Sequence, residues 1–274
     1  MKKLILLLLL LGHVGVMAQR KPKIKGNKTV TEVKEELPAF NAIELKDDLD
    51  IQLVRAPSEG YKVVADDNLL DVLKFKVEDS TLYISSFYKI QSRKKLEITV
   101  YYADLVHLVQ LDGKMVSKES VVSDVLHIEV LGSARMELNA SAALVRLQMD
   151  EKSSGDFNLA ADSLHVNMKD RAVARIYAVG QSSYMELSSN ASASLEGSVD
   201  IVQLEALDNT DFKAERYDAK VIKAKLENSS SAYLRALEEL ELATNGSSKA
   251  YIYANPKITI VEFLDTSELI KRKD

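Results

Sequence analysis

The second half of the chain repeats itself about every nineteen residues, and this repeat restricts the possible folds more than any other feature. The central apolar residues of the repeat are spaced by 19, 19, 19, 19, 20 and 18 positions: Ile128, Leu147, Val166, Met185, Leu204, Ala224 and Leu242. Around each of them apolar and polar residues alternate, as in a half-buried β-strand. The alternation argues against a helical repeat, whose apolar residues recur at three and four positions.

A second alternating segment follows each first one after a short polar turn. The middle residues of these second segments are Met136, Phe157, Ile176, Leu195, Phe212, Leu234 and Ile252. The turns carry residue types that tolerate left-handed backbone or bond to their own main chain: Gly132, Ser154, Asp170, Asn190, Asn209, Asn228 and Asn245. Nineteen residues are too few for a four-stranded propeller blade.

These repeats predict an all-β fold, a parallel β-helix or β-solenoid with coils of about nineteen residues. In such a stack, like residues lie above like residues at the spacing of hydrogen-bonded strands, about 4.8 Å. The central residues Ile128, Leu147, Val166 and Met185 are therefore expected to form one interior column. The regular repeats extend over residues 126–254.

Residues 37–122 have the same alternation with a poorer period, and the segment from Asp67 to Leu73 interrupts it with what could be one turn of helix. We expect this part to form irregular entry coils and a less regular N-terminal cap, within a single domain over residues 37–270. A solenoid needs an atypical end to cover its open stack. The segment after Ile258 departs from the repeat and is expected to cap the other end.

Residues 1–18 have the composition of a secretory signal peptide. Lys2 and Lys3 precede a short apolar run, and the segment ends on Ala18, a small residue suited to cleavage. Its apolar part is shorter than the roughly 20 residues that a membrane span requires. We therefore expect cleavage after Ala18 and export to the periplasm or cell surface. Residues 19–36 are rich in lysine with little apolar periodicity, which predicts a flexible basic arm.

Composition argues against several classes of function. The chain has 36 Lys and Arg against 41 Asp and Glu, and removal of Lys2 and Lys3 leaves 34 − 41 = −7. Such a charge lacks the electrostatic footprint of a nucleic-acid-binding protein. The absence of cysteine excludes disulfides, thiolate metal sites and cysteine nucleophiles. No stretch after the signal peptide is long and apolar enough to span a membrane.

The sequence identifies no catalytic residue, metal ligand or cofactor-binding motif. His127 and His165 occupy the same outward place two coils apart, which separates them by roughly twice 4.8 Å, too far to share one metal. His107 could neighbour His127, but the register of the first coils is ambiguous. Acidic residues do not recur at one outward position in adjacent repeats, so no enzyme is expected. The alternative is a carbohydrate-active enzyme, a polysaccharide lyase or glycosidase, because neighbouring coils can bring two carboxylates into reach of each other.

The outward positions of four neighbouring first segments form a candidate ligand face, here called the first-strand strip. Its residues are Arg146, Gln148, His165, Asn167, Tyr184, Glu186, Gln203 and Glu205. At about 4.8 Å per coil the strip measures roughly 14 Å between its outermost rows. Mixed hydrogen-bonding groups on a flat face suit a glycan or an extended chain of an envelope protein better than a small metabolite, which needs a concave pocket. The alternative is an ordinary solvated face, which any soluble solenoid requires.

Several segments resemble one known family. FNAIELKDDLDIQLVRA at 40–56, VVADDNLLDVLKFKVEDSTLYIS at 63–85, and the turns LGSARMEL and SSGDFNL are similar to the auto-transporter adhesin head GIN domain. The resemblance covers about residues 37–254, with the family's Gly-Ser-Gly turns replaced by Gly-Ser-Ala, Ser-Ser-Gly and Asn-Ser-Ser. It implies an exported β-solenoid of the kind widespread in Bacteroidetes, with an adhesin-like, non-enzymatic binding or scaffold role at the cell envelope.

Overall fold

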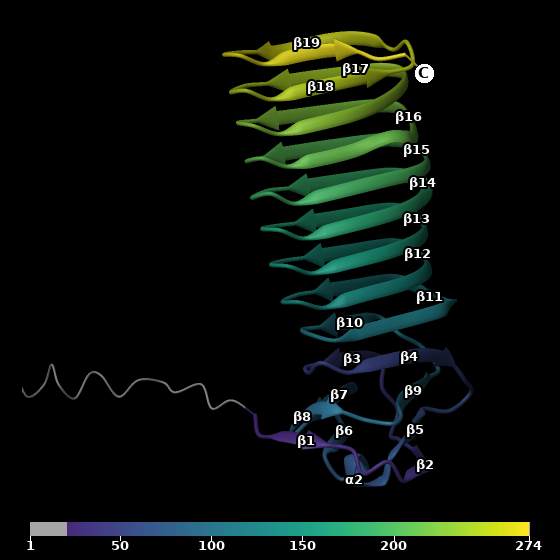
Figure 1. The fold of residues 1–274 in the computed structure, drawn as a ribbon. Coiled ribbons are helices and arrows are strands. Elements are labelled where there is room, and N and C mark those ends of the chain that lie inside the picture. Colours follow the sequence, from purple (N-terminus) through teal and green to yellow (C-terminus); the bar gives the residue numbers. More distant parts are fainter. Residues whose placement is uncertain (1–20, 274) are drawn as a thin grey trace, which may run out of the picture.

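The computed structural model describes residues 21–273 and is a tall β-solenoid of about nine turns (Figure 1). Its body consists of long parallel strands, each paired with the next along the chain. These strands are β11 (Lys114–Val130), β12 (Arg135–Met149), β13 (Ser154–Met168), β14 (Val173–Leu187), β15 (Ser192–Leu207), β16 (Asp211–Glu227) and β17 (Ser231–Thr244). The all-β solenoid predicted from the repeat is confirmed.

Each long strand bends midway, so that its first half lies on one face of the solenoid and its second half on the other (Figure 1). The second segment of one repeat and the first segment of the next therefore belong to one continuous strand. For example, ARMEL at 134–138 leads into VRLQM at 145–149 within β12. A tight turn then separates this strand from the next one.

The predicted interior column is confirmed in register. Ile128 pairs with Leu147, and the ladder continues through Val166, Met185, Leu204, Ala224 and Leu242. All seven residues are buried. The exact alternation of apolar and polar residues across equal coil lengths accounts for this agreement, because a shift by one residue would turn every side chain to the opposite face.

The middle residues of the second segments do not all stack on one another, unlike those of the first segments. Met136 pairs with Gly155 rather than Phe157, and Phe212 pairs with Ala193 rather than Leu195. Both are shifted by two residues along the strand, which keeps them on the inward face. Met136 and Phe157 are 21 residues apart, and Leu195 and Phe212 are 17 residues apart, so both separations depart from the nineteen-residue coil and reflect this shift.

Left-handed backbone marks the turn of each coil. Positive φ angles occur where predicted at Gly132, Asp170, Asn190, Asn209 and Asn228. The turn prediction for Ser154 is wrong, because Ser154 begins β13 and Glu151 (φ 63°) holds the left-handed position. Asn245 lies in its turn directly after β17 as predicted, but the adjacent Gly246 (φ 69°) holds the left-handed position there. Carboxylate, amide and glycine residues at successive turns thus perform the same backbone task.

The first coils stack out of chain order. β3 (Ala42–Leu45) pairs with β10 (His107–Gln110) on one side and with β7 (Thr81–Ser86) on the other. On the second face, β4 (Asp50–Arg55) lies between β11 and β9 (Leu96–Tyr102). The coil made by residues 42–55 is therefore inserted between strands that come later in the sequence, which the poor period of this region did not reveal.

Antiparallel strands complete the N-terminal cap. β5 (Gly60–Asp66) pairs with β9, and β6 (Leu73–Glu78) forms a hairpin with β7. The predicted helical turn is present as α2 (Asp67–Leu70). The irregular entry region thus consists of parallel coils that continue the body and of antiparallel strands at the N-terminal end of the stack (Figure 1).

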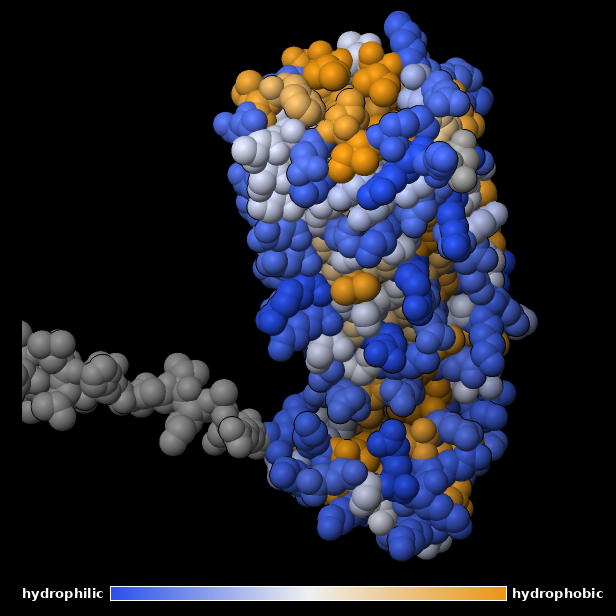
Figure 2. Space-filling view, turned by 45° about the horizontal axis from the view of Figure 1, so that its top comes forward, coloured by the Kyte–Doolittle hydropathy of each residue, from blue (hydrophilic) through white to orange (hydrophobic). Residues whose placement is uncertain are grey.

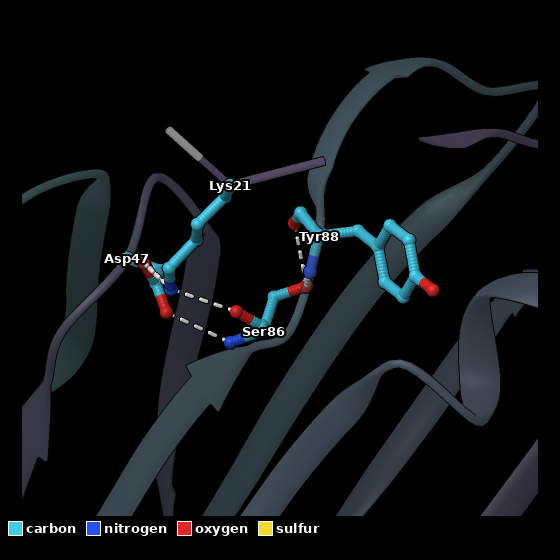
Figure 3. Close-up of polar contacts among 4 residues, drawn as sticks. All are labelled: Lys21, Asp47, Ser86 and Tyr88. Atoms are coloured by element: carbon cyan, nitrogen blue, oxygen red, sulfur yellow. Dashed lines mark hydrogen bonds and ion pairs between the residues drawn. The ribbon is translucent and has the colours of Figure 1, made fainter. Parts of the chain in front are cut away.

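The basic segment forms strands over its described part, which corrects the predicted flexible arm. β1 (Lys23–Lys25) pairs with β8 (Lys89–Ser92), and β2 (Val30–Glu36) pairs with β5. Lys21 Nζ donates to the Ser86 carbonyl oxygen at 2.8 Å and forms an ion pair with Asp47 (Figure 3). The segment has little apolar periodicity because its strands are largely exposed, while their backbone groups pair with the cap.

A buried carboxylate fixes the same segment to the cap. The Asp66 side chain accepts hydrogen bonds from the backbone N–H groups of Lys28, Lys94 and Lys95, each at 3.1 Å. Burial opposes ionisation of this group, but the three backbone donors outweigh it and lower the pKa of Asp66. Gly26 allows the chain to cross here, because a Cβ at this position would lie 2.0 Å from Asp66 Oδ2.

The C-terminal end is open, in contrast to the expected cap. β18 (Lys249–Tyr253) and β17 pair with β20 (Glu268–Lys271) and β19 (Lys257–Phe263), which continue the two faces by one more coil. Among the described residues, no strand pairs with the outer edges of β19 and β20. Val261 is 63% exposed, and apolar side chains gather at this end of the molecule (Figure 2). The segment extends the stack and leaves its end uncovered.

The expected signal peptide over residues 1–18 lies outside the described residues. Across residues 21–273, no helix has the length and apolar character needed to cross a membrane.

Candidate functional site

The structure assembles the first-strand strip as the sequence predicted. Arg146, His165, Tyr184 and Gln203 form one row across β12 to β15, and Gln148, Asn167, Glu186 and Glu205 form the second row. The buried residues between the rows, such as Leu147 and Val166, fix the outward direction of the strip residues. The placement is thus shown, while the role of the strip as a ligand face stays a prediction.

Cross-coil contacts order the side chains of the strip. Asn167 Nδ2 donates to Glu186 Oε2 at 2.7 Å, and the rings of His165 and Tyr184 lie 6.0 Å apart between centroids. Burial, together with the charges of Glu205 and Glu186, raises the pKa of the Tyr184 hydroxyl. This hydroxyl therefore remains protonated and available as a hydrogen-bond donor. A shallow depression of about 280 Å³ lies over these residues.

Two histidines and one glutamate extend the strip toward the N-terminal end. His107 pairs with His127, which resolves the ambiguous register of the first coils, and their ring centroids are 6.0 Å apart. His107 Nε2 lies 3.0 Å from Glu129 Oε1. Burial and the neighbouring positive charge of Arg146 lower the pKa of His127, so its ring favours the neutral form. The neutral ring can accept a hydrogen bond from Arg146 Nη1, which lies 3.4 Å from His127 Nε2.

A larger hollow lies on the other face, where no site was predicted because the candidate ligand face comprised outward positions of the first segments alone. We call it the second-strand groove; it has a volume of about 590 Å³. Most of its polar lining comes from the outward positions of β12, β13 and β14: Glu137, Asn139, Asp156, Asn158, Arg175 and Tyr177. Its two ends are lined by Ser117 and Lys118 of β11 and by Ser194 and Glu196 of β15. The signal that could have revealed it is the concentration of charged, amide and aromatic residues at these outward positions of the second segments.

Ion pairs between neighbouring coils hold the charged side chains of the groove. Arg175 binds Asp156 through two contacts, with Nη2 at 2.8 Å from Oδ2. Lys114 Nζ lies 2.6 Å from Glu137 Oε1. The hydrogen bond from Arg175, aided by its charge, lowers the pKa of Asp156 although partial burial opposes this. Both carboxylates are therefore engaged by a cation of a neighbouring coil, and Asp156 is held in its charged form.

The structure offers no metal centre within residues 21–273, where no group of three or more histidine, aspartate or glutamate side chains could hold an ion together. The two polar surfaces thus contain hydrogen-bonding groups, paired charges and aromatic rings. Chemically, these groups can bind a ligand through hydrogen bonds and ring contacts.

The model of one protein family matches most of the chain. The family is described as "Putative auto-transporter adhesin, head GIN domain", and the matches cover residues 39–176 and 152–256. Their overlap within the repeats agrees with the near-identity of successive coils. A comparison with curated proteins gives no match.

Solved structures share the fold at low sequence identity. A protein of Parabacteroides merdae described as a putative adhesin has a TM-score of 0.66 at 13% identity, covering 92% of this chain and 99% of its own. A putative adhesin of Parabacteroides distasonis has a TM-score of 0.66 at 14% identity, covering 91% and 100%. A putative lipid binding protein of the same species has a TM-score of 0.62 at 17% identity, covering 91% and 99%. At such identities these likenesses show the fold alone.

Proposed function

The chain belongs to the family of the auto-transporter adhesin head GIN domain, and we propose that it is an exported, non-enzymatic binding or scaffold protein of the cell envelope. The family makes the protein adhesin-like. The first-strand strip is the proposed contact surface, and its ligand is a glycan or an extended chain of an envelope protein. The observation that carries the proposal is the alignment of eight polar strip residues in two straight rows on a rigid sheet.

Rigid placement favours binding because little side-chain freedom remains to be lost when a ligand docks. Asn167 and Glu186 already hold each other at 2.7 Å, and Tyr184 is only partly exposed beside His165. The flat surface and the small depression suit a partner that lies along several coils. A small metabolite would instead need an enclosing pocket.

The acidic residues of the larger groove support a non-enzymatic function. A glycosidase or lyase on this fold is the alternative, and a glycosidase requires a carboxylic acid whose raised pKa keeps it protonated. The expectation that acidic residues do not recur at one outward position in adjacent coils is wrong, because Glu137 pairs with Asp156 and Glu186 with Glu205. The spacing of neighbouring strands brings the carboxylates of Asp156 and Glu137 near the separation of a retaining pair. However, Arg175 lowers the pKa of Asp156, and Lys114 pairs with Glu137. Asp156 is therefore unsuited to donate a proton to a leaving group, and Glu137 is already held by a cation.

The proposed export rests on the signal peptide expected from the sequence. The mature protein should begin at Gln19, after cleavage behind Ala18. Mass spectrometry of the N-terminal peptide from the native host tests this. Recovery of a membrane-bound protein that still begins at Met1 would contradict it.

Binding through the strip is tested on a glycan array and by pull-down from envelope fractions. The wild type is compared with a double variant, His165→Ala and Tyr184→Ala, after circular dichroism confirms that both are folded. We expect a partner that binds the wild type and is lost by the double variant. Undiminished binding by the folded variant would exclude the strip as the contact surface. Cleavage of an array glycan, detected as released product, would favour the enzyme instead.

A further inference from the structure

We propose that the second-strand groove is an independent binding site for a straight, uncharged glycan chain that lies along the solenoid axis. The groove is formed by the first halves of the long strands, which are the second segments of the repeats. The first-strand strip is formed by the second halves of these strands, which are the first segments of the repeats. It therefore goes beyond the proposed function, because it adds a second contact surface with its own ligand chemistry.

The ends of the groove coincide with irregularities in the strand ladder. The pairing of β11 with β12 shifts between Ser117 and Ser120, and the pairing of β15 with β16 shifts between Ser194 and Glu196. Between them, β12 to β15 pair without a shift. β-Bulges in natural sheets are concentrated next to functional sites, where they redirect side chains or end a regular ladder.

The regular ladder makes the groove straight. One wall follows the register from Val116 through Glu137, Asp156 and Arg175 to Ser194. Four steps between hydrogen-bonded strands span about 19 Å at about 4.8 Å per step. A chain of several sugar rings fits such a length, and a straight chain meets equivalent outward positions coil after coil.

Tyr177 supplies an aromatic surface in the middle of the groove. Its side chain is 50% exposed although it is large and partly apolar. It pairs in register with Asn158, which is also exposed. In the described part of the chain, neither the Tyr177 hydroxyl nor the Asn158 amide has a hydrogen-bond partner. An exposed ring beside a free amide offers an apolar face for the C–H side of a sugar ring and donors and acceptors for its hydroxyl groups.

The charge of the groove favours an uncharged ligand. Asp156 is bound by Arg175, Glu137 by Lys114 and Glu196 by Arg216, the last pair at 3.0 Å. These three carboxylates are thus each matched by one cation. Lys118, the remaining charged side chain of the lining, adds a single cation that no described carboxylate matches, which is too little charge to hold a polyanionic chain. The matched charges present hydrogen-bonding groups instead.

Calorimetric titration with defined hexasaccharides tests the proposal. The uncharged probes are cellohexaose, xylohexaose and mannohexaose, and the charged probe is hexagalacturonate. The protein is the chain without residues 1–18, as wild type, Tyr177→Ala, Asn158→Ala, the strip variant Tyr184→Ala and the matched control Tyr88→Ala, an exposed tyrosine of the N-terminal cap. Thermal melts establish that each variant is folded, which is expected because the substituted side chains reach the surface.

We expect at least one uncharged hexasaccharide to bind the wild type and the Tyr88→Ala control with equal affinity. Tyr177→Ala should weaken that binding at least tenfold, and Asn158→Ala should weaken it severalfold. Raising the salt concentration from 50 to 500 mM should leave the affinity unchanged, because uncharged ligands are not screened.

Three results would overturn the proposal: no binding of any uncharged probe, binding of hexagalacturonate alone, or undiminished binding by a folded Tyr177→Ala variant. Loss of binding in Tyr184→Ala with retention in Tyr177→Ala would place the glycan on the first-strand strip. That outcome would refute the groove and leave the proposed function intact. Loss in Tyr177→Ala alone would support the groove and leave the strip to be judged by its own double variant.

Discussion

The ring of Phe157 fills the space beside Gly155 that a side chain at residue 155 would need. A Cβ on Gly155 would lie 2.2 Å from Phe157 Cε2, well inside contact distance. Gly155 pairs with Met136 in the coil on one side and with Ala174 on the other, so it occupies an inward position. The large ring is therefore accommodated by the smallest residue within its own strand.

This relationship predicts that Gly155→Ala destabilises the protein. The added methyl group overpacks the interior, because the Phe157 ring is buried and has little room to move. We expect a loss of about 1–3 kcal/mol in the free energy of unfolding, measured by urea denaturation. The double variant Gly155→Ala with Phe157→Leu should recover part of this loss. An unchanged urea midpoint in the single variant would contradict the packing described for this position.

The same position shows why the middle residues of the second segments stack less regularly than those of the first segments. Ile128 and Leu147 are separated by one coil of nineteen residues, and they align. Met136 and Phe157 look equivalent in the sequence, but Gly155 is the true partner of Met136. Side chains of a strand point to the same face at every second residue, so a shift of two residues keeps a side chain inward. Alternation in the sequence therefore indicates whether a residue points inward, but not which residue of the next coil it pairs with.

The inward and outward positions should respond differently to the same substitution. Leu204→Asp places a charge without a partner in the buried column and should cost about 3–5 kcal/mol. Gln203→Asp, at the adjacent exposed position, should change stability by no more than about 0.5 kcal/mol. Thermal melts of the two variants measure this difference. Equal damage at both positions would mean that the strand faces are assigned wrongly.

Asp66 should make the N-terminal cap sensitive to acid. The backbone donors lower the pKa of Asp66 below its ordinary value of 3.8, so the native state binds a proton less readily than the unfolded chain. This contribution to stability is present above the unfolded pKa and is lost as the pH falls through the folded pKa. Asp66→Asn should therefore be less stable than the wild type at pH 7, with a difference that shrinks below about pH 4.

Urea unfolding at pH 7 and pH 3 measures the effect at Asp66. Asp67→Asn provides a control on the neighbouring carboxylate, which is exposed. A stability difference between wild type and Asp66→Asn that stays constant across this pH range would show that the carboxylate is not stabilised by its three backbone donors.

The cap itself was harder to predict than the body. In residues 37–122 the alternation indicated strands, but no constant period related one strand to another. The position of β3 between β7 and β10 depends on pairing across long stretches of chain. The strands of the basic segment depend on backbone pairing with β5 and β8, to which side-chain periodicity gives no clue. Outside the regular repeat, the local pattern of residues does not determine which strand pairs with which.

Removal of one complete coil should leave a shorter folded protein. Deletion of residues 164–182 joins Ser163 to Ser183, the register partner of Leu164. The remaining coils then meet in unchanged register, and in a solenoid each coil contacts mainly its neighbours. We expect an unchanged β-sheet signal per residue in circular dichroism and one cooperative melt. Deletion of residues 164–173, half a coil, should prevent folding. Every residue after the deletion would then lie on the opposite face of the stack from its register partner in the preceding coil.

The candidate surfaces were predicted only in part. The strip came from outward positions whose order follows directly from the repeat, and Arg146, His165 and Tyr184 align accordingly. The groove was missed because its volume depends on how the strands bend and on where bulges interrupt the ladder. Neither property is visible in an alternation of residue types, although the charged and aromatic outward residues Arg175 and Tyr177 are.

The most direct test of the account is saturation binding of the purified chain, without residues 1–18, to intact cell envelopes of its own host. We predict saturable binding whose affinity is reduced at least tenfold in the double variant of His165→Ala and Tyr184→Ala. Envelope material recovered from the complex should keep its mass, because a binding protein does not cleave its ligand. Binding that does not saturate, or that the folded double variant retains in full, would contradict the claim that the protein acts through the first-strand strip.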